Sequence, residues 1–382
     1  MPVNFSKQQI EDTKNNIDNI DENKSTLKKI DDFLLKFSRV PLKERLFFVQ
    51  HLGVMLKSGI SLSIAIKTLS KQTENKYFKK VLSDIAEEVE KGKSFTEALT
   101  PHKKIFGELF ISMVEAGELS GKLEEVLKQL HLQMKKDHKL ISKVKGALTY
   151  PVVILAAMFG IGTFMIVFII PKITSMFEEM GTELPLPTKI LIGISDAIVN
   201  NGLLSLAIFI IVVGSFLKTI KTYKGKYIFQ GLLLKMPIFS PIIKKINLAR
   251  FARNISSLLK TDIMIIKTFQ ITANVLGNLH YREALLEMSQ KIKQGEKLSD
   301  TINSHPELFT PVVAQMVAVG EETGELDNIL IELAEFYEEE VDQVMENLPA
   351  IIEPLLILVL GVGVGGVAVA IIMPMYSITE SI

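Results

Sequence analysis

The stretch Met316-Val317-Ala318-Val319-Gly320-Glu321-Glu322-Thr323-Gly324-Glu325-Leu326 decides the fold, because most of it occurs twice in the chain. The earlier copy is Met113-Val114-Glu115-Ala116-Gly117-Glu118-Leu119-Ser120-Gly121-Lys122-Leu123. The interval between the copies, called the repeat shift below, also superposes without a gap Phe48 on Phe251, Gly92 on Gly295, Phe106 on Phe309, Pro151 on Pro354 and Pro171 on Pro374. A long internal repeat sets the division into domains. The sequence therefore predicts two copies of one module, each followed by an apolar segment.

The composition is typical of a membrane protein with large water-soluble parts. The 382 residues are 48% hydrophobic and 23% charged, and the charges are excluded from a few long windows. Because the sequence contains no cysteine, it excludes a disulfide framework, a thiolate metal site and a cysteine nucleophile. The formal net charge is zero, which argues against nucleic acid as the main partner.

Residues 1–40 form a polar N-terminal arm. They hold seven basic and seven acidic side chains among Asn, Gln, Ser and Thr, and no apolar run follows Met1. We therefore expect no cleavable signal peptide, and an arm that is weakly helical, disordered or ordered only with a partner.

Residues 41–146 have a helical pattern throughout and form the first module. Phe48, Leu52 and Leu56 fall at spacings of three and four on a helix predicted to end near Ser58. Ser94, with Glu97 three residues later, matches a capping box. Further helices are expected at 60–69, 79–90, 106–115 and 122–145. Short links and the absence of strand alternation predict an antiparallel bundle of about six helices, with a second such module, preceded by a linker, within 221–350.

Three apolar runs are long enough to cross a membrane. Residues 151–170 carry no charge, and at about 1.5 Å per residue they cover a hydrocarbon core of about 30 Å. The predicted spans are 147–170, 203–220 and 351–373, with an external loop at 171–202 and an external tail at 374–382. The prolines of the run 184–188 should break any helix in that loop. The predicted fold is an all-α integral membrane protein with two homologous cytoplasmic antiparallel helical bundles and three transmembrane helices.

Lysines flank these spans unevenly, which predicts the orientation. Many follow the second span or precede the first, whereas the 171–202 loop has only Lys172 and Lys189 and the tail after Pro374 has none. By the positive-inside rule, the N-terminus and both modules are cytoplasmic, and the loop and the C-terminus are external.

The repeated motif itself predicts a tight corner between two helices. We expect Gly117 and Gly320 to end a helix in the left-handed conformation, and Ser120 and Thr323 to cap the next helix. The acidic residues of the motif would then lie beside a helix N-terminus. Two interpretations stay open: a structural corner only, or a corner that also contacts a partner or a cation. The motif residues considered are Gly117, Glu118, Gly121, Gly320, Glu321 and Gly324.

Proline, acidic and glycine residues also mark the membrane segments. Pro151 opens the first span and Pro354 the equivalent position of the third, where Glu353 can reach the interface or serve a function. Gly361 and Gly365 form a small-xxx-small surface that permits close helix packing, within one subunit or between subunits.

The sequence shows no catalytic, cofactor or metal site. Residues 117–123 resemble a phosphate-binding loop, but the glycine spacing is one residue short and Leu123 replaces the magnesium-binding Ser or Thr. His131 and His138 lie about two helical turns apart, which is too far for adjacent ligation. The acidic residues between Glu332 and Asp342 could collect a hard cation, but a solvated helix face is the simpler interpretation.

The chain resembles the PilC/GspF/ComGB family of inner-membrane platform proteins, which serve type IV pili, type II secretion and competence pseudopili. The resemblance rests on both corner motifs, on Leu148-Thr149-Tyr150-Pro151, on Phe251-Ala252-Arg253, and on Glu353-Pro354 with Pro374-Met375-Tyr376. It covers the chain from about Pro41 to the end. Two departures are the polar arm, which replaces an aromatic and glycine-rich region found in many members, and Asp262, which stands where the first copy has Gly59.

This resemblance implies a non-enzymatic platform that couples a motor ATPase to the insertion or extraction of pilin subunits. Implied partners are the cytoplasmic secretion-type ATPase, pilins or pseudopilins, other inner-membrane assembly proteins, membrane lipid and further copies of the chain, without a cofactor. The main alternative is a small three-span transporter or channel, which predicts more polar residues within the spans. A receptor would have a larger external domain.

The two modules differ in charge. Residues 41–146 hold 19 basic and 13 acidic side chains, whereas residues 247–350 hold 8 and 17. Either the modules attract each other, within a chain or between chains, or the basic module faces the anionic leaflet.

Overall fold

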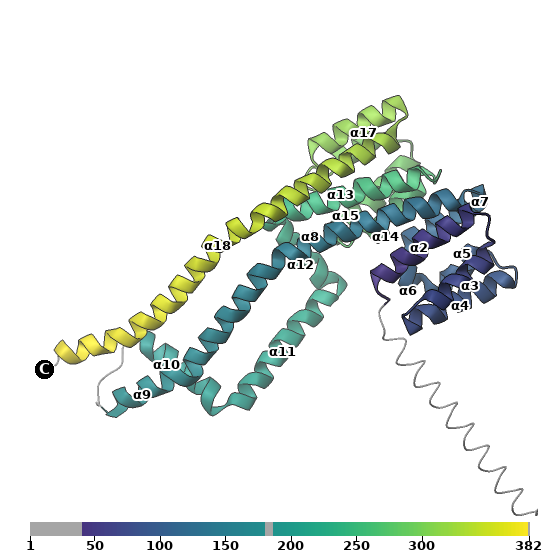
Figure 1. The fold of residues 1–382 in the computed structure, drawn as a ribbon. Helices are drawn as coiled ribbons and strands as arrows, with labels where there is room; N and C mark the ends of the chain where they lie inside the picture. Colours follow the sequence, from purple (N-terminus) through teal and green to yellow (C-terminus); the bar gives the residue numbers. More distant parts are fainter. Residues whose placement is uncertain (1–39, 180–185, 381–382) are drawn as a thin grey trace, which may run out of the picture. The chain divides into compact units, whose positions relative to one another are not determined.

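The computed structural model describes residues 40–179 and 186–380, and within these ranges it contains helices and no strand (Figure 1). The chain divides into two compact units. Unit 1 comprises the described residues up to Lys135 together with Ser257–Met264, and unit 2 comprises Lys136–Ser256 and the described residues from Ile265 onward. The expected conformations of the polar arm and of residues 184 and 185 lie outside the described residues.

Unit 1 is a bundle built around three phenylalanines. Its helices are α2 (Leu42–Lys57), α3 (Leu62–Gln72), α4 (Lys76–Glu90), α5 (Phe95–Leu99), the 3₁₀ helix η1 (Thr100–His102), α6 (Lys103–Phe106), α7 (Glu108–Ser120) and the start of α8 (Leu123–Phe164). The rings of Phe48, Phe78 and Phe106 lie 5.8 to 6.1 Å apart. The predicted capping box at Ser94 and Glu97 is confirmed.

Unit 2 holds the second bundle and most of the apolar helices. After α8 come the π-helix η2 (Met165–Ile169), α9 (Ile170–Glu179), α10 (Leu186–Asn200), α11 (Gly202–Lys221), α12 (Tyr223–Lys235), α13 (Phe239–Leu259), α14 (Ile265–Val275), α15 (Leu279–Lys293), α16 (Leu298–Asn303), α17 (Pro311–Thr323) and α18 (Leu326–Glu380). The rings of Phe251, Tyr281 and Phe309 repeat the aromatic core. Tyr281 donates a hydrogen bond to the carbonyl of Leu308, and burial raises the pKa of its phenol.

The internal repeat is also a structural repeat. The first residues of α14, α15, α16, α17 and α18 are related by the repeat shift to the first residues of α3, α4, α5, α7 and α8, respectively. The left-handed turn glycines follow the same shift, since Gly92 has φ 90° and Gly295 has φ 91°. The predicted pair of helical modules is therefore present.

Three helices are long and apolar enough to cross a membrane, namely those over Leu123–Ser175, Gly202–Lys221 and Leu326–Ala370. The first does not end near Lys145 as expected, because α8 continues through Pro151 into the apolar segment. Likewise α18 runs without a break through Pro354. A proline costs a helix one N–H donor and strains the preceding turn, and apolar helices tolerate this locally. The 171–202 segment, expected to be a loop, includes α9 and α10.

Candidate functional site

A glutamate of the repeated motif caps a short helix in unit 1. Glu118, near the end of α7, accepts hydrogen bonds from the backbone N–H of Phe95 at 2.6 Å and of Thr96 at 3.0 Å, and from the Thr96 hydroxyl at 2.7 Å. These N–H groups open α5 and have no partner within their own helix. The carboxylate therefore ties the end of α7 to the start of α5.

The same arrangement occurs in unit 2. Glu321, near the end of α17, accepts from the backbone N–H of Leu298 at 2.9 Å and of Ser299 at 3.3 Å, and from the Ser299 hydroxyl at 3.2 Å. Every partner is displaced from its unit 1 counterpart by the repeat shift. The motif glutamate does lie beside a helix N-terminus, but this helix is the short one that precedes the motif and not, as predicted, the one that follows it.

The expected left-handed conformation of Gly117 and Gly320 is wrong. Both lie inside helices, and the left-handed residues are Gly121, with φ 70°, and Gly324, with φ 76°. Gly117 lacks a side chain for a different reason: a Cβ there would lie 2.8 Å from Cγ2 of Val126. A Cβ on Gly320 would lie 3.0 Å from the Cα of Leu326. These glycines allow the next helix to approach closely.

Ser120 and Thr323 do not cap the next helix as expected. Their hydroxyls donate to the carbonyls of Ala116 and Val319, both at 2.8 Å, which is the pattern of residues still within a helix. Thr323 also accepts a long hydrogen bond, 3.4 Å, from the N–H of Glu325.

The departure at Asp262 changes the residue but not the turn. Asp262 has φ 60° and its counterpart Gly59 has φ 79°, so both are left-handed. Asp is one of the few side chains that tolerate this region. Its carboxylate lies 3.4 Å from the amine of Lys122.

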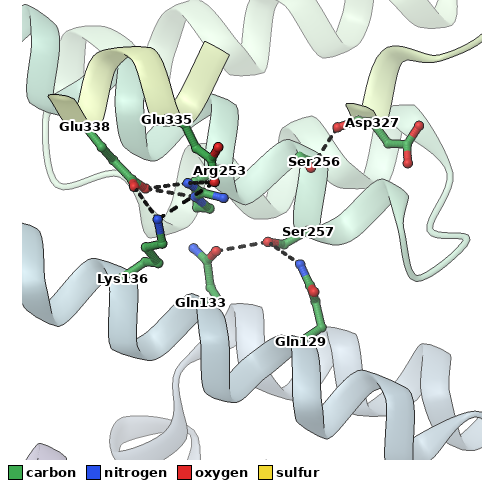
Figure 2. A network of polar contacts seen from close by, with 9 residues as sticks. All are labelled: Gln129, Gln133, Lys136, Arg253, Ser256, Ser257, Asp327, Glu335 and Glu338. Carbon is green, nitrogen blue, oxygen red and sulfur yellow. Dashed lines mark hydrogen bonds and ion pairs between the residues drawn. The ribbon is translucent and has the colours of Figure 1, made fainter. Parts of the chain in front are cut away.

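A network of ion pairs connects α8, α13 and α18 in unit 2 (Figure 2). Glu338 accepts from Nε of Arg253 at 2.9 Å and from Nζ of Lys136 at 3.1 Å. The side chains of Arg253 and Glu338 are only 13% and 18% exposed, so solvent screens this pair less than a surface pair. Arg250 with Asp137, Lys143 with Asp342, and Lys245 with Glu340 extend the network.

Figure 2 also shows a polar contact that belongs to unit 1. The Ser257 hydroxyl donates to Oε1 of Gln133 at 2.9 Å and accepts from Nε2 of Gln129 at 3.2 Å. Sequence reasoning singled out Arg253 as a motif residue but missed its pairing with Glu338. The repeat shift places Arg253 on Gln50 and Glu338 on Lys135, which shows that both positions differ between the copies but does not indicate that they pair.

A sequence model of the family described as type II secretion system protein F matches the chain twice, at residues 48–171 and 251–374. The chain belongs to the type II secretion system protein F family. The two matched stretches are related by the repeat shift, as are the corner glutamates.

Similar proteins carry type IV pilus or type II secretion names. The type IV pilus assembly protein PilC of Thermus thermophilus is 36% identical over 88% of this chain and 83% of its own length. PilC of Myxococcus xanthus is 32% identical over 91% and 83%, and the type II secretion system protein F of Aeromonas hydrophila is 28% identical over 86% and 84%. The resemblance found in the sequence is thereby confirmed.

The acidic run of this protein F family member is largely neutralised by cations. Four of its residues each form an ion pair with a lysine or arginine, namely Glu335, Glu338, Glu340 and Asp342.

A separate cleft of about 380 Å³ in unit 2 has His280, Glu283, Glu287 and His305 in its lining. Among the described residues, no group of three or more His, Asp or Glu side chains is arranged to hold a metal ion.

The remaining predicted positions lie on the two long helices of this family member. Pro151 is in α8, and Glu353, Pro354, Gly361 and Gly365 are in α18. Glu353 is exposed. A Cβ placed on Gly361 or Gly365 would meet no described atom within 4 Å, so their small-residue surface is open in this chain.

Proposed function

We propose that the chain is the inner-membrane platform of a machine that assembles type IV pili or type II secretion pseudopili. It couples a cytoplasmic motor ATPase to the insertion or extraction of pilin subunits, and it does so without chemistry of its own. The role requires binding surfaces and mechanical connection, and the corner glutamates and the ion-pair network supply connection. Type IV pilus and type II secretion names among its relatives support this assignment.

The observation that carries the proposal is the continuity of α18. This helix runs from Leu326 to Glu380, with the network residues Glu338 and Asp342 on its polar part and the apolar run 351–373 on the same helix. A helix of hydrogen-bonded turns is stiff along its axis. A displacement of the second module would therefore reach the membrane segment without a hinge.

The proposed topology places both modules and the N-terminus in the cytoplasm. Lysines support it, because they concentrate before the apolar run 151–170 and after α11. Reporter fusions after Gly146, Asn200, Met345 and at the C-terminus should read inside, outside, inside and outside. An external signal at Met345 would overturn the topology.

We further propose that several copies of the chain assemble in the membrane. The open surface of Gly361 and Gly365 supports packing against a helix of another subunit. The charge difference between the modules gives less support to docking between subunits, because Lys136 and Lys143 already pair with Glu338 and Asp342 in the same chain.

A flexible insertion tests the coupling. Four glycines inserted between Glu346 and Asn347 should interrupt α18 between its polar and apolar parts. The variant should accumulate in the membrane but lose filament assembly. The same insertion after Gly295, a left-handed turn residue between α15 and α16, is the control and should retain assembly. Normal assembly by the α18 variant would contradict the proposal.

A further inference from the structure

Helix α12 begins where the apolar helix α11 ends, and the chain changes direction sharply between them (Figure 1). Thr222 alone separates them, with extended backbone at φ −71° and ψ 152°, and its hydroxyl accepts from the N–H of Gly225 at 3.2 Å. The rings of Phe216 and Phe229 lie 6.5 Å apart. In one straight helix, these two residues would be separated by about 20 Å. Helix α12 therefore starts beside the end of the apolar helix.

One side of α12 is fixed to α15 and to the turn before it. Gln230 accepts from the N–H of Leu279 at 2.8 Å and donates to the carbonyl of Gly277 at 3.2 Å. The Tyr227 ring lies 4.0 Å from the His280 ring. Gly231 also belongs to this side, because a Cβ there would lie 3.0 Å from Nε2 of His280.

The other side of α12 is apolar and exposed. Ile228 is 71% exposed and Leu232 is 58% exposed. At about 100° per residue, both lie about 160° around the helix from Gln230 and about 100° to 140° from Tyr227, so they point away from the contacts with α15. Lys224 and Lys235 are exposed and flank them at the two ends of the same face. Three further apolar residues that follow the helix are also exposed, namely Met236, Ile238 and Phe239, at 38%, 39% and 37%.

The exposed side of α12 forms a stripe of four residues, Lys224, Ile228, Leu232 and Lys235. We propose that this stripe lies in the headgroup region of the anionic leaflet. Large apolar side chains exposed in a row mark a binding surface. The neighbouring surface identifies the occupant, because α11 carries no charge from Gly202 to Leu217 and Phe216 near its end lies against Phe229. Amphipathic helices of this kind bury their apolar face at the boundary between headgroups and acyl chains, and lysines add attraction to anionic lipid.

The stripe would set the distance of the second module from the membrane surface. Because α12 is bonded to α15 on its other side, α15 and the rest of the bundle would be held at a fixed height above the bilayer. The inference rests on the proposed membrane position of α11, so the experiment must test that position separately.

The absence of cysteine makes single spin labels straightforward to place. The full-length chain, reconstituted in vesicles of phosphatidylglycerol and phosphatidylethanolamine, is labelled in turn at Ile228→Cys, Leu232→Cys, Leu206→Cys and Val319→Cys. Leu206 lies in α11 and reports whether that helix is in the bilayer. Val319, 50% exposed in α17, is the control for an apolar residue that faces water. Collision of each label with oxygen and with a water-soluble nickel chelate is then measured by electron paramagnetic resonance.

Labels at Ile228 and Leu232 should collide more often with oxygen and less often with the nickel chelate than the label at Val319. Their depth in the bilayer should lie between that of Val319 and that of Leu206. Replacing Lys224 and Lys235 with Gln should reduce this shift in anionic vesicles. The proposal is overturned if Ile228 and Leu232 collide with the nickel chelate as often as Val319 while Leu206 is buried. Protection of Ile228 in native membranes but not in pure vesicles would also overturn it, in favour of a protein partner. A water-exposed Leu206 would instead contradict the proposed membrane position of α11.

Discussion

The two corner glutamates, Glu118 in unit 1 and Glu321 in unit 2, make the same three hydrogen bonds to residues that are related by the repeat shift. The two copies differ at other positions. Where unit 2 has Arg253 and Glu338 in an ion pair, the equivalent positions of the first copy hold Gln50 and Lys135. Both copies therefore keep the corner, whereas the ion pair is present in the second copy only at these positions.

This difference separates a contact that both copies make from contacts that only one copy makes at the equivalent positions. A corner made by a carboxylate and two backbone N–H groups is local, so both copies can keep it. The ion pairs connect helices far apart in sequence, and only the second copy carries them at these positions. The predictions below test whether the corners are energetically equal and whether the network is specific to unit 2.

The largest effect is expected at the close-approach glycines. Gly117→Ala and Gly320→Ala should each destabilise the chain by about 1–3 kcal/mol, because the added methyl group overpacks the contact with the following helix. Thermal unfolding of the full chain in detergent measures this. Gly146→Ala is the control, since Gly146 lies in α8 with open space around it and should be stabilised by up to about 1 kcal/mol. Wild-type stability of both test variants would refute the close-approach explanation.

The corner glutamates should give the next largest effect. Glu118→Ala and Glu321→Ala each leave two helix-opening N–H groups without their carboxylate, which should cost about 1–2 kcal/mol. The comparison predicts equal losses in the two copies. Glu→Gln at either position should lose less, because the amide oxygen still accepts a hydrogen bond. A loss confined to one copy would show that the corners are not equivalent.

The ion-pair network should contribute less. Arg253→Gln removes one of two cations from a largely buried Glu338, and we expect a loss of about 1 kcal/mol, measured in a double-mutant cycle with Glu338→Gln. The matched control is Lys57→Gln, whose 3.8 Å contact with Glu124 is largely exposed and should change stability negligibly. Equal effects of the two variants would show that the low exposure of the Arg253 pair adds nothing to its strength.

The smallest effect is expected at the turn that differs in residue but not in conformation. Asp262→Gly and Gly59→Asp should each change stability by less than about 1 kcal/mol, the first towards greater stability. Gly59→Val is the contrasting variant, because a β-branched side chain is poorly tolerated at positive φ. If Gly59→Asp lowers the stability as much as Gly59→Val does, an Asp side chain does not tolerate this turn better than a β-branched one, and the explanation given for Asp262 is wrong.

Much of the fold could be predicted because the signals are local and repeated. The capping box at Ser94 and the apolar runs are short patterns, and both predict features that the structure contains. The internal repeat is long, but it can be read directly by comparing the sequence with itself. The corner motif was located correctly, but its glycines were assigned the wrong roles. A helix-internal glycine that permits packing and a glycine that ends a helix look alike in one sequence.

The helix ends and the network could not be predicted for a different reason. Pro151 and Pro354 are strong signals for a boundary, yet each lies inside a continuous helix, and apolar helices tolerate the loss of one hydrogen bond at a proline. The pairing of Arg253 with Glu338 joins residues 85 positions apart. Charge alone identified the acidic run of α18, and only the packing of α13 and α8 against it shows which cations it meets.

The continuity of α18 is the central claim, and a distance measurement tests it directly. Spin labels at Phe336→Cys and Leu358→Cys, both on exposed positions of α18, lie on either side of Pro349 and Pro354. At about 1.5 Å per residue, an unbroken helix separates the two backbone positions by about 33 Å. Pulsed electron paramagnetic resonance on the reconstituted chain should give a single narrow distribution near that distance. A broad distribution, or one centred well below the value for an unbroken helix, would show a hinge and contradict the account.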